Sequence, residues 1–395
     1  MLRFAFTIAV GLAIGPGSAA ASAPNQAQGS DPAISMPQVK AAIDKLGDLD
    51  FPTRMTAGRT VRRAPAPVAV PALLEAVAAH KDGYVRFRAL VLLAGFNDPR
   101  TREVMLSSLA EPNDRLRTVA YAYFEHNPDA SVLPRLLAAS AKEDSEFVRP
   151  PLMRALAAHG SDARVRETMS GLVVKGQDFF RSAVIEALGD HKAVYAAPRI
   201  TEVAKLDGPL QDDAVVALGK IGDKAALPVF AALQRSAPRN TQPAIAGAIC
   251  LLGVNCTTHV NYLIDTLRFA IKNPGFQDLL RAASASLAAL AAGGHEKAAE
   301  ILIEHGVPSR DPARAAIALA LGTVALRNTP LLLKVLERQP DPGPAVELLR
   351  DAFDMLEEDF EEERFFVHVR RAYWQAAEAS ATRKVANALI QRLEF

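Results

Sequence analysis

The sequence predicts an all-α solenoid, in which about 10–11 antiparallel helix pairs stack side by side and wind into a right-handed superhelix. Three observations support this fold: a helix–stop–helix unit that recurs along the chain, a recurrence interval close to 31 residues, and a composition rich in alanine and leucine. These two residues favour helices over strands. A fixed interval in this range is typical of a stacked array and not of separate globular domains.

The clearest copy of the unit covers residues 212–233. The apolar residues Ala214, Val215, Leu218 and Ile221 fall on one face of a helix. Gly222 is expected to end this helix, because glycine tolerates the left-handed conformation of a helix end. The next residue, Asp223, can accept hydrogen bonds from the free amides of the following helix.

The repeat interval is marked by an arginine near the start of each second helix. These arginines lie at positions 86, 117, 149 and 181, so their spacings are 31, 32 and 32 residues. Each follows an acidic turn residue by three or four positions, where the helix dipole favours negative charge. An exposed ion pair is worth only about 0.2–1 kcal/mol. We therefore interpret this arginine ladder as structure that sets the register between repeats, and the ligand-binding interpretation as the alternative.

The remaining elements follow from apolar periodicity and from Gly, Pro and Asp punctuation. A first pair covers 36–46 and a basic helix, 51–63, which the prolines of residues 64–67 end. Regular pairs then follow to Gly253. Longer, less regular pairs are expected at 260–272 with 276–292, 295–305 with 311–326, 329–338 with 344–360, and 364–379 with 382–393.

The first 35 residues do not fit this pattern. One positive charge, a short apolar run and then small residues are typical of a secretory signal peptide, which we expect to span residues 1–21. An uncleaved anchor is the alternative. Residues 22–35 are polar and are predicted to form a flexible leader. Residues 36–256 are predicted to form regular repeats, and residues 257–395 are predicted to form divergent repeats with a C-terminal cap. The expected location is therefore outside the cytoplasm, in the periplasm or the extracellular space.

Several segments carry a family resemblance. They are Leu133-Pro134-Arg-Leu-Leu137, Val85-Arg86-Phe-Arg-Ala89-Leu90, and the Ala-Leu-Gly-Lys-Ile-Gly-Asp run that ends at Asp223. The chain resembles the HEAT repeat family, in particular the short HEAT-like repeats of phycobilisome lyases, and exported bacterial proteins that carry such repeats. The resemblance implies an α-solenoid whose second helices line a concave side that holds proteins or peptides. It does not imply lyase activity, and a shared fold does not identify a ligand.

No catalytic motif is evident in the sequence. It lacks a phosphate-binding glycine loop, a nucleophile elbow and a His-Glu-x-x-His metal motif, so we expect no enzyme activity, no cofactor and no metal. The net charge of +1 gives no reason to expect binding to nucleic acid. Cys250 and Cys256 flank a predicted turn, and they form either a local disulfide or two unrelated thiols.

Two charged stretches leave three interpretations open. Arginines make the N-terminal repeats basic, and residues 357–363 are strongly acidic. These are solvated helix faces, or a polarised binding surface, or the basis of head-to-tail association between copies. The candidate partner contacts are Arg59, Arg62, Arg63, Arg86, Arg88 and Arg117.

The expected function is that of an exported, non-enzymatic scaffold that binds a protein or peptide on its concave face. An accessory subunit of an envelope enzyme and a structural envelope component are the alternatives.

Overall fold

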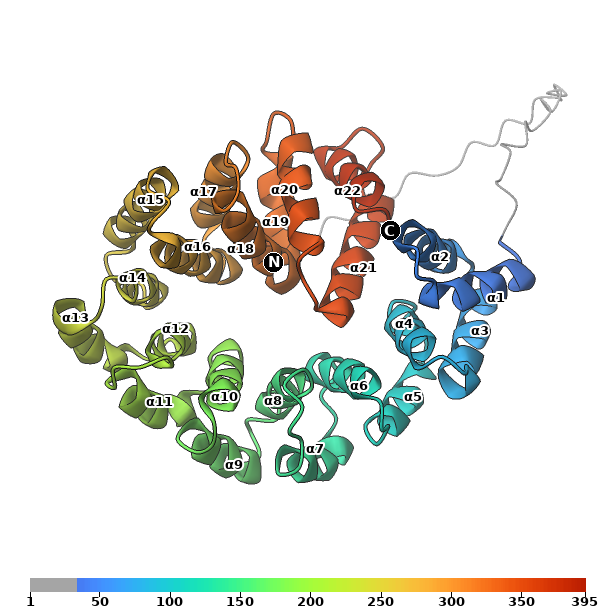
Figure 1. The fold of residues 1–395 in the computed structure, drawn as a ribbon, viewed down its shortest axis with the longest axis horizontal. Coiled ribbons are helices and arrows are strands. Elements are labelled where there is room, and N and C mark those ends of the chain that lie inside the picture. The colour runs from blue at the N-terminus through green and yellow to red at the C-terminus, as the bar shows by residue number, and fades with distance from the viewer. Residues whose placement is uncertain (1–33) are drawn as a thin grey trace, which may run out of the picture. The chain divides into compact units, whose positions relative to one another are not determined.

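The computed structural model describes residues 34–395, which form one compact unit. The predicted signal peptide and nearly all of the predicted leader lie outside the described residues. The described part contains 22 α-helices and no β-strand. The all-α solenoid is therefore correct, and the helices follow one another as antiparallel pairs (Figure 1).

The helices of the first half are α1 (Met36–Asp44), α2 (Phe51–Arg63), α3 (Ala66–Ala79), α4 (Gly83–Ala94), α5 (Thr101–Ser108), α6 (Asp114–His126), α7 (Leu133–Ser140), α8 (Arg149–Ala157), α9 (Ala163–Val173), α10 (Asp178–Asp190) and α11 (Ala197–Ala204). Those of the second half are α12 (Gln211–Ile221), α13 (Leu227–Ser236), α14 (Gln242–Leu251), α15 (Cys256–Lys272), α16 (Gln277–Ala292), α17 (Glu296–Gly306), α18 (Ala313–Arg327), α19 (Thr329–Glu337), α20 (Gly343–Phe353), α21 (Asp359–Gln375) and α22 (Ala381–Arg392).

The local signals act as predicted in the central repeat. Gly222 ends α12 with a φ of 83°, and the Asp223 side chain accepts a hydrogen bond from the amide of Ala225. The predicted apolar residues of α12 are all buried. Caps and apolar periodicity are therefore sufficient to predict where α12 ends and which of its residues are buried.

The arginine ladder makes the contacts that a structural role requires. Arg86 donates to the carbonyl of Val77 at 2.8 Å and to Glu111 of the next repeat at 2.7 Å. Arg117 likewise donates to the carbonyl of Glu111 and to Glu143 of the following repeat. Arg86 and Arg117 thus contact the end of their own first helix and also tie two repeats together. Arg149 and Arg181 donate hydrogen bonds within their own repeat, to the carbonyls of Glu143 and Val173 respectively.

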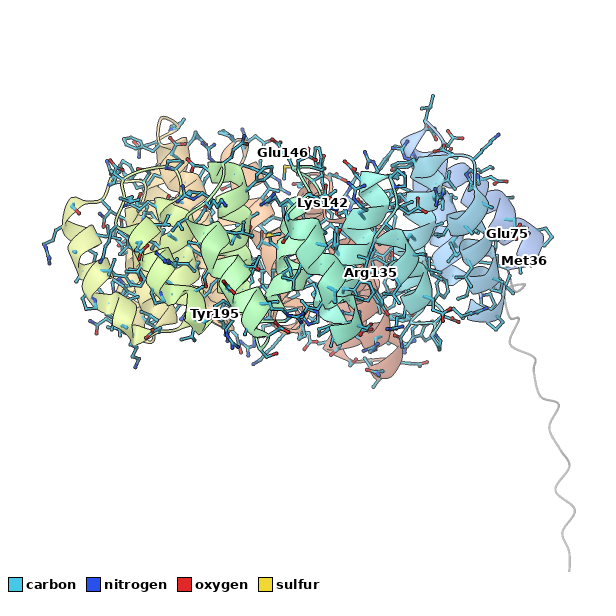
Figure 2. The ribbon with its side chains drawn as sticks, turned by 90° about the horizontal axis from the view of Figure 1, so that it is seen from below. Met36, Glu75, Arg135, Lys142, Glu146 and Tyr195 are labelled. Carbon is cyan, nitrogen blue, oxygen red and sulfur yellow. A yellow bond between two sulfur atoms is a disulfide. The ribbon has the colours of Figure 1, made fainter. Side chains whose placement is uncertain are left out.

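The two helices of a pair lie in different layers. Consecutive second helices, from α4 through α18, contact one another and form the inner layer of a curve. The first helices form the outer layer, whose exposed face carries polar side chains such as Glu75 and Arg135, with Lys142 in the turn after α7 (Figure 2). Two apolar cores run between the layers, one from Val39 to Leu252 and one from Ala246 to Phe395, and they meet at α14.

The predicted helix 344–360 is wrong, because the structure divides it. α20 ends at Phe353, and α21 begins at Asp359 after a short linker. Asp359, Glu361 and Glu362 lie in the first turn of α21, where the helix dipole favours acidic side chains. The break turns α21 back toward the N-terminal repeats, which it contacts at α4 and α6.

Candidate functional site

The curve of helices closes on itself through α21. Phe360, near the start of α21, is buried and belongs to the apolar core of the N-terminal repeats. Its ring lies edge-on to Tyr123 and stacks on His126, both from α6. Apolar packing therefore contributes to the contact between α21 and α6.

The basic and acidic stretches of the sequence meet in this contact, within one chain. Arg62 of α2 pairs with Glu363 at 2.7 Å, and both side chains are almost fully buried. Arg88 of α4 pairs with Asp359, and Arg59 lies 3.8 Å from Glu394. Only the pair of Arg62 and Glu363 is buried, and removal of one of these partners would leave the charge of the other away from water. This pair therefore holds the closure in register, and the two more exposed pairs contribute less.

The pKa values of two adjacent carboxyl groups in this contact are shifted in opposite directions. Burial acts to raise the pKa of Glu361, but the hydrogen bond with His126 and the charges of Arg364 and Arg327 lower the pKa to about 2. Burial raises the pKa of Glu362 to about 8, and the charge of Asp359 adds to this effect. Glu361 is therefore ionised at neutral pH, while Glu362 is mostly protonated.

A cavity of about 1070 Å³ lies inside the curve. The helices α10 and α12 supply one wall and α16 and α18 the opposite wall. Ligand pockets commonly measure about 300–1,000 Å³, so the cavity is large enough for a short peptide segment or a large small molecule. A second cavity of about 270 Å³ lies where α21 meets α4 and α6.

The wall from α16 and α18 is mostly apolar and rich in alanine, and its polar members are Arg281, Ser286, Thr323 and Arg327. The alanines of α16 that line it recur at helical spacing, so they form one stripe. On α18 the stripe continues with Ala316, Leu319 and Thr323, and Leu319 remains 38% exposed. The α16 members are Ala282, Ala285, Ala289 and Ala292. Small side chains leave the backbone accessible and give the wall a smooth surface.

The wall from α10 and α12 is acidic. Glu186, Asp212 and Asp213 all line the cavity. Burial raises the pKa of both aspartates, against the effect of a side-chain hydrogen bond from Thr241 to Asp212 and from Ser182 to Asp213. The neighbouring negative charge adds to the rise for each of them. The hydroxyl of Ser182 donates a hydrogen bond to Asp213 at 2.6 Å.

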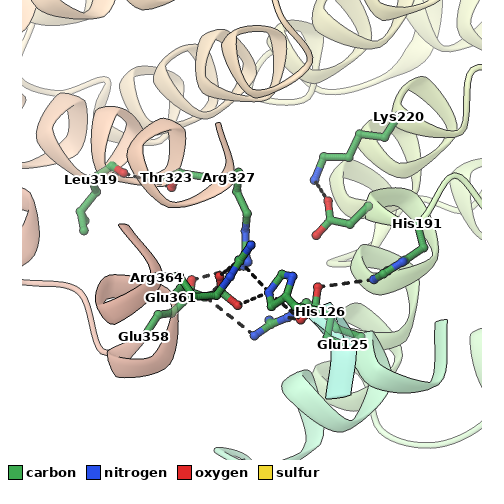
Figure 3. A network of polar contacts seen from close by, with 12 residues as sticks. Glu125, His126, His191, Lys220, Leu319, Thr323, Arg327, Glu358, Glu361 and Arg364 are labelled. Atoms are coloured by element: carbon green, nitrogen blue, oxygen red, sulfur yellow. Dashed lines mark hydrogen bonds and ion pairs between the residues drawn. The ribbon is translucent and has the colours of Figure 1, made fainter. Parts of the chain in front are cut away.

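A polar network closes the end of the cavity next to α21 (Figure 3). Glu125 of α6 accepts from Arg154 at 2.9 Å and lies 3.4 Å from His191. His126 lies 2.7 Å from Glu361, and Arg327 pairs with Glu358 at 3.0 Å. Burial opposes ionisation of Glu125, yet the pKa of this carboxyl is lowered by His191 and by the charge of Arg154. The network holds five helices together and has its charges largely paired.

Two groups of side chains have the composition of a metal site. Ligand atoms of Glu125, His126 and Glu361 lie within 4.8 Å of one another, but arginines already pair with both carboxylates. Cys250, Cys256 and His295 form the other group, in which the two sulfurs are joined as a disulfide. The ion pairs in one group and the disulfide in the other use the donors that a metal would need.

The structure places the six arginines singled out by the sequence in three settings. Arg59, Arg62 and Arg88 face the C-terminal helices. Arg86 and Arg117 belong to the arginine ladder. Arg63 is exposed at the end of α2.

Sequence reasoning missed the acidic wall and the alanine stripe. Asp212 and Asp213 open the predicted unit 212–233, and the alanines of α16 lie within the predicted helix 276–292, so neither group forms a recognisable motif. The available signal was the alanine-rich run from Ala282 to Ala292, which carries small residues on both its buried and its exposed face.

Among residues 34–395, no single helix is long and apolar enough to cross a membrane. Of these residues, only α18 and α19 taken together are long and apolar enough, and the chain bends by 116° at the break between them.

Comparison with known proteins gives structural similarity without sequence similarity. No protein-family model matches the chain, and no curated protein matches it. Among solved structures, YibA of Escherichia coli is 18% identical over 54% of this chain and 81% of its own, with a TM-score of 0.40. The CpcE–CpcF complex of phycocyanin lyase from Nostoc is 19% identical over 66% of this chain and 97% of that one, with a TM-score of 0.40.

The similarity extends to a longer helical protein. Kap121p in complex with Ste12p is 13% identical over 91% of this chain and 50% of its own, with a TM-score of 0.41. Because these TM-scores lie below 0.5, the fold assignment rests on the described helices themselves.

Proposed function

We propose that this protein is a non-enzymatic binding protein that holds an extended peptide segment of a protein partner in the cavity inside the helical curve. The observation that carries the proposal is the cavity itself, with an apolar wall of small side chains facing an acidic one. Apolar pockets with a few placed polar groups are the usual form of a binding site.

The closure by α21 limits what the concave side can hold. The inner helices of the N-terminal repeats are already covered by α21. A cavity of about 1070 Å³ accommodates a short extended segment and excludes a folded domain. The proposal therefore narrows the partner from a protein surface to a peptide segment.

The arginines singled out by the sequence take two roles in this proposal. Those that pair with α21 stabilise the curve that forms the cavity. Arg63, which is exposed, is the one that a partner reaches most easily without displacing α21. Direct contact between a partner and the other five stays a prediction.

A cavity-filling variant tests the proposal. Ala285 is exposed on the cavity side of α16, and tryptophan at this position fills space that a peptide needs. We expect peptides selected against the wild-type protein from a random display library to bind Ala285→Trp at least about tenfold more weakly, a loss of about 1.4 kcal/mol. Fluorescence anisotropy with the selected peptides measures this change.

The matched control places the same side chain on the outside. Ala231 is exposed on the outer helix α13, so Ala231→Trp should leave peptide affinity unchanged. Thermal melting of both variants checks that they fold. Equal binding to wild type and to Ala285→Trp, or a library that yields no specific peptide, would show that the cavity is not the binding site.

We also propose that the protein works outside the cytoplasm. The sequence of residues 1–21 and the disulfide between Cys250 and Cys256 support an oxidising compartment. Intact mass spectrometry of the protein purified from its cell envelope is expected to show a chain that begins at residue 22. A chain that retains Met1–Ala21 would contradict cleavage, and recovery from the cytoplasm would contradict export.

A further inference from the structure

We infer that the cavity selects a peptide segment with one cationic side chain, lysine or arginine, flanked by small apolar side chains. This inference rests on the proposed function and adds the chemical class of the ligand. The cation would lie against the carboxylates of Glu186, Asp212 and Asp213, and the apolar flanks against the alanine stripe of α16.

Most of the basic side chains that line the cavity pair with acids outside this acidic wall. Lys220 pairs with Asp190 at 2.6 Å, Arg327 with Glu358 and Arg364 with Glu361. Arg281, on the opposite wall, pairs with Asp278, and Lys192 is exposed in the turn after α10.

In contrast, none of the three acids of the wall forms an ion pair with a basic side chain of residues 34–395. Lys220 comes nearest, since its charge acts to lower the pKa of Asp213. Burial and the negative charge of a neighbour both disfavour ionisation of Asp212 and Asp213, and for Asp213 that neighbour is Glu186. A bound cation would stabilise the ionised form of these carboxylates by its opposite charge.

A purely structural role accounts for only part of this arrangement. Asp212 and Asp213 lie in the first turn of α12, where the helix dipole stabilises acidic side chains. Glu186 lies in the last third of α10, far from any helix start, and is exposed to the cavity. A carboxylate there adds like charge to Asp213 and gains nothing from a helix dipole.

The opposite wall fixes the rest of the ligand. The alanine stripe offers no hydrogen-bonding side chains along Ala282, Ala285 and Ala289, so it favours small apolar groups over polar ones. The whole protein carries a net charge of only +1, so it has no general attraction for cations. A preference for cationic peptides would therefore arise locally, from carboxylates that line the cavity, and the acids of this wall are the ones that lack an ion-pair partner in the part of the chain that the structure describes.

Three synthetic peptides test the inference. They share an alanine- and leucine-containing frame of nine residues with a fluorescent label, and the central residue is lysine, norleucine or glutamate. Norleucine keeps the length of the lysine chain and removes the charge. We expect the lysine peptide to bind full-length wild-type protein at least about tenfold more tightly than the norleucine peptide, with the glutamate peptide weakest.

The double variant Glu186→Gln with Asp212→Asn should remove this preference. We expect the lysine and norleucine peptides to bind it with affinities within about twofold, while the norleucine affinity stays at the wild-type value. The matched control is Glu167→Gln with Asp207→Asn, which makes the same change in net charge at exposed positions outside the cavity lining. This control should keep the wild-type preference.

The outcomes separate this inference from the proposed function. Equal binding of the lysine and norleucine peptides, with both lost in Ala285→Trp, would overturn the cationic preference and leave the peptide-binding cavity in place. A preference that survives in the double variant would also overturn it, because the acids would not be its source. If no peptide binds, or if all bind Ala285→Trp normally, both proposals are wrong.

Discussion

Glu361 and Glu362 are adjacent in sequence, yet the structure places them in different electrostatic surroundings. Glu361 points to His126 and Arg364, so the pKa of Glu361 falls to about 2. Glu362 is partly buried beside Asp359, and the pKa of Glu362 rises to about 8. A helix turns successive side chains by about 100°, so adjacent residues meet different neighbours.

These two groups predict opposite effects of pH on the closure. The folded pKa of Glu361 lies below its ordinary value of 4.5, so its stabilisation is present above pH 4.5 and is lost as the pH falls toward 2. The folded pKa of Glu362 lies above 4.5, so its contribution is complete below pH 4.5 and is lost as the pH rises through 8. We expect the free energy of unfolding to reflect both losses when denaturant titrations are repeated across this range.

Single variants assign each loss to its residue. Glu362→Gln should flatten the fall in stability between pH 4.5 and 8 and leave the acid side as in wild type. Glu361→Gln should weaken the fall in stability below pH 4.5 and leave the fall in stability above pH 4.5 as in wild type. If the difference between Glu362→Gln and wild type does not change with pH, Glu362 is not held in its protonated form.

At the scale of the helix, close approach between inner helices allows the tight curve. A Cβ added at Gly189 of α10 would lie 2.8 Å from the Cα of Ala217 on α12. A Cβ added at Gly219 of α12 would lie 2.7 Å from the Cα of Ala248 on α14. Small residues at these crossings bring the backbones of the inner layer together, so this layer is shorter than the outer one and the stack bends.

This packing predicts that a usually favourable substitution becomes unfavourable. In a helix interior, alanine is generally more stable than glycine by about 0.5–1 kcal/mol. At Gly219 the added methyl group forces α12 and α14 apart, so Gly219→Ala should destabilise the protein by about 1–3 kcal/mol. Chemical denaturation measures the change.

Gly171 of α9 is the matched control for this prediction. A Cβ at this position meets nothing within 4 Å, so Gly171→Ala should be neutral or stabilising. If Gly219→Ala stabilises the protein as Gly171→Ala does, the close approach of α12 and α14 is not what sets the curve.

At the scale of the whole molecule, the sequence predicts the repeat but not the closure. Gly222, Asp223 and the arginine ladder act over distances of one repeat or less, so periodicity and capping are sufficient to predict them. The pair between Arg62 and Glu363 joins residues 301 positions apart. Such a contact depends on the summed curvature of all intervening pairs, and no local pattern records it.

The candidate site escaped prediction for the same reason. Asp212 and Ala285 lie on different helix pairs and face one cavity only because the stack curves. The basic and acidic stretches were visible in the sequence, but whether they meet within one chain or between two depends on that curvature. The linker after Phe353, which redirects α21, lay inside a segment with continuous helical periodicity.

The closure predicts a change in size when its anchors are removed. Phe360 supplies the apolar contact with the N-terminal core, and Glu363 supplies the buried pair with Arg62. We expect Phe360→Ala with Glu363→Ala to separate α21 from α4 and α6 and to increase the radius of gyration in small-angle X-ray scattering. Trp374→Ala with Glu378→Ala removes the same kinds of side chain where both are exposed, so it should keep the wild-type radius. Because the opened curve loses the polar end of the cavity, the first variant should also bind cavity peptides more weakly; an unchanged radius with full peptide affinity would show that the curve closes without α21.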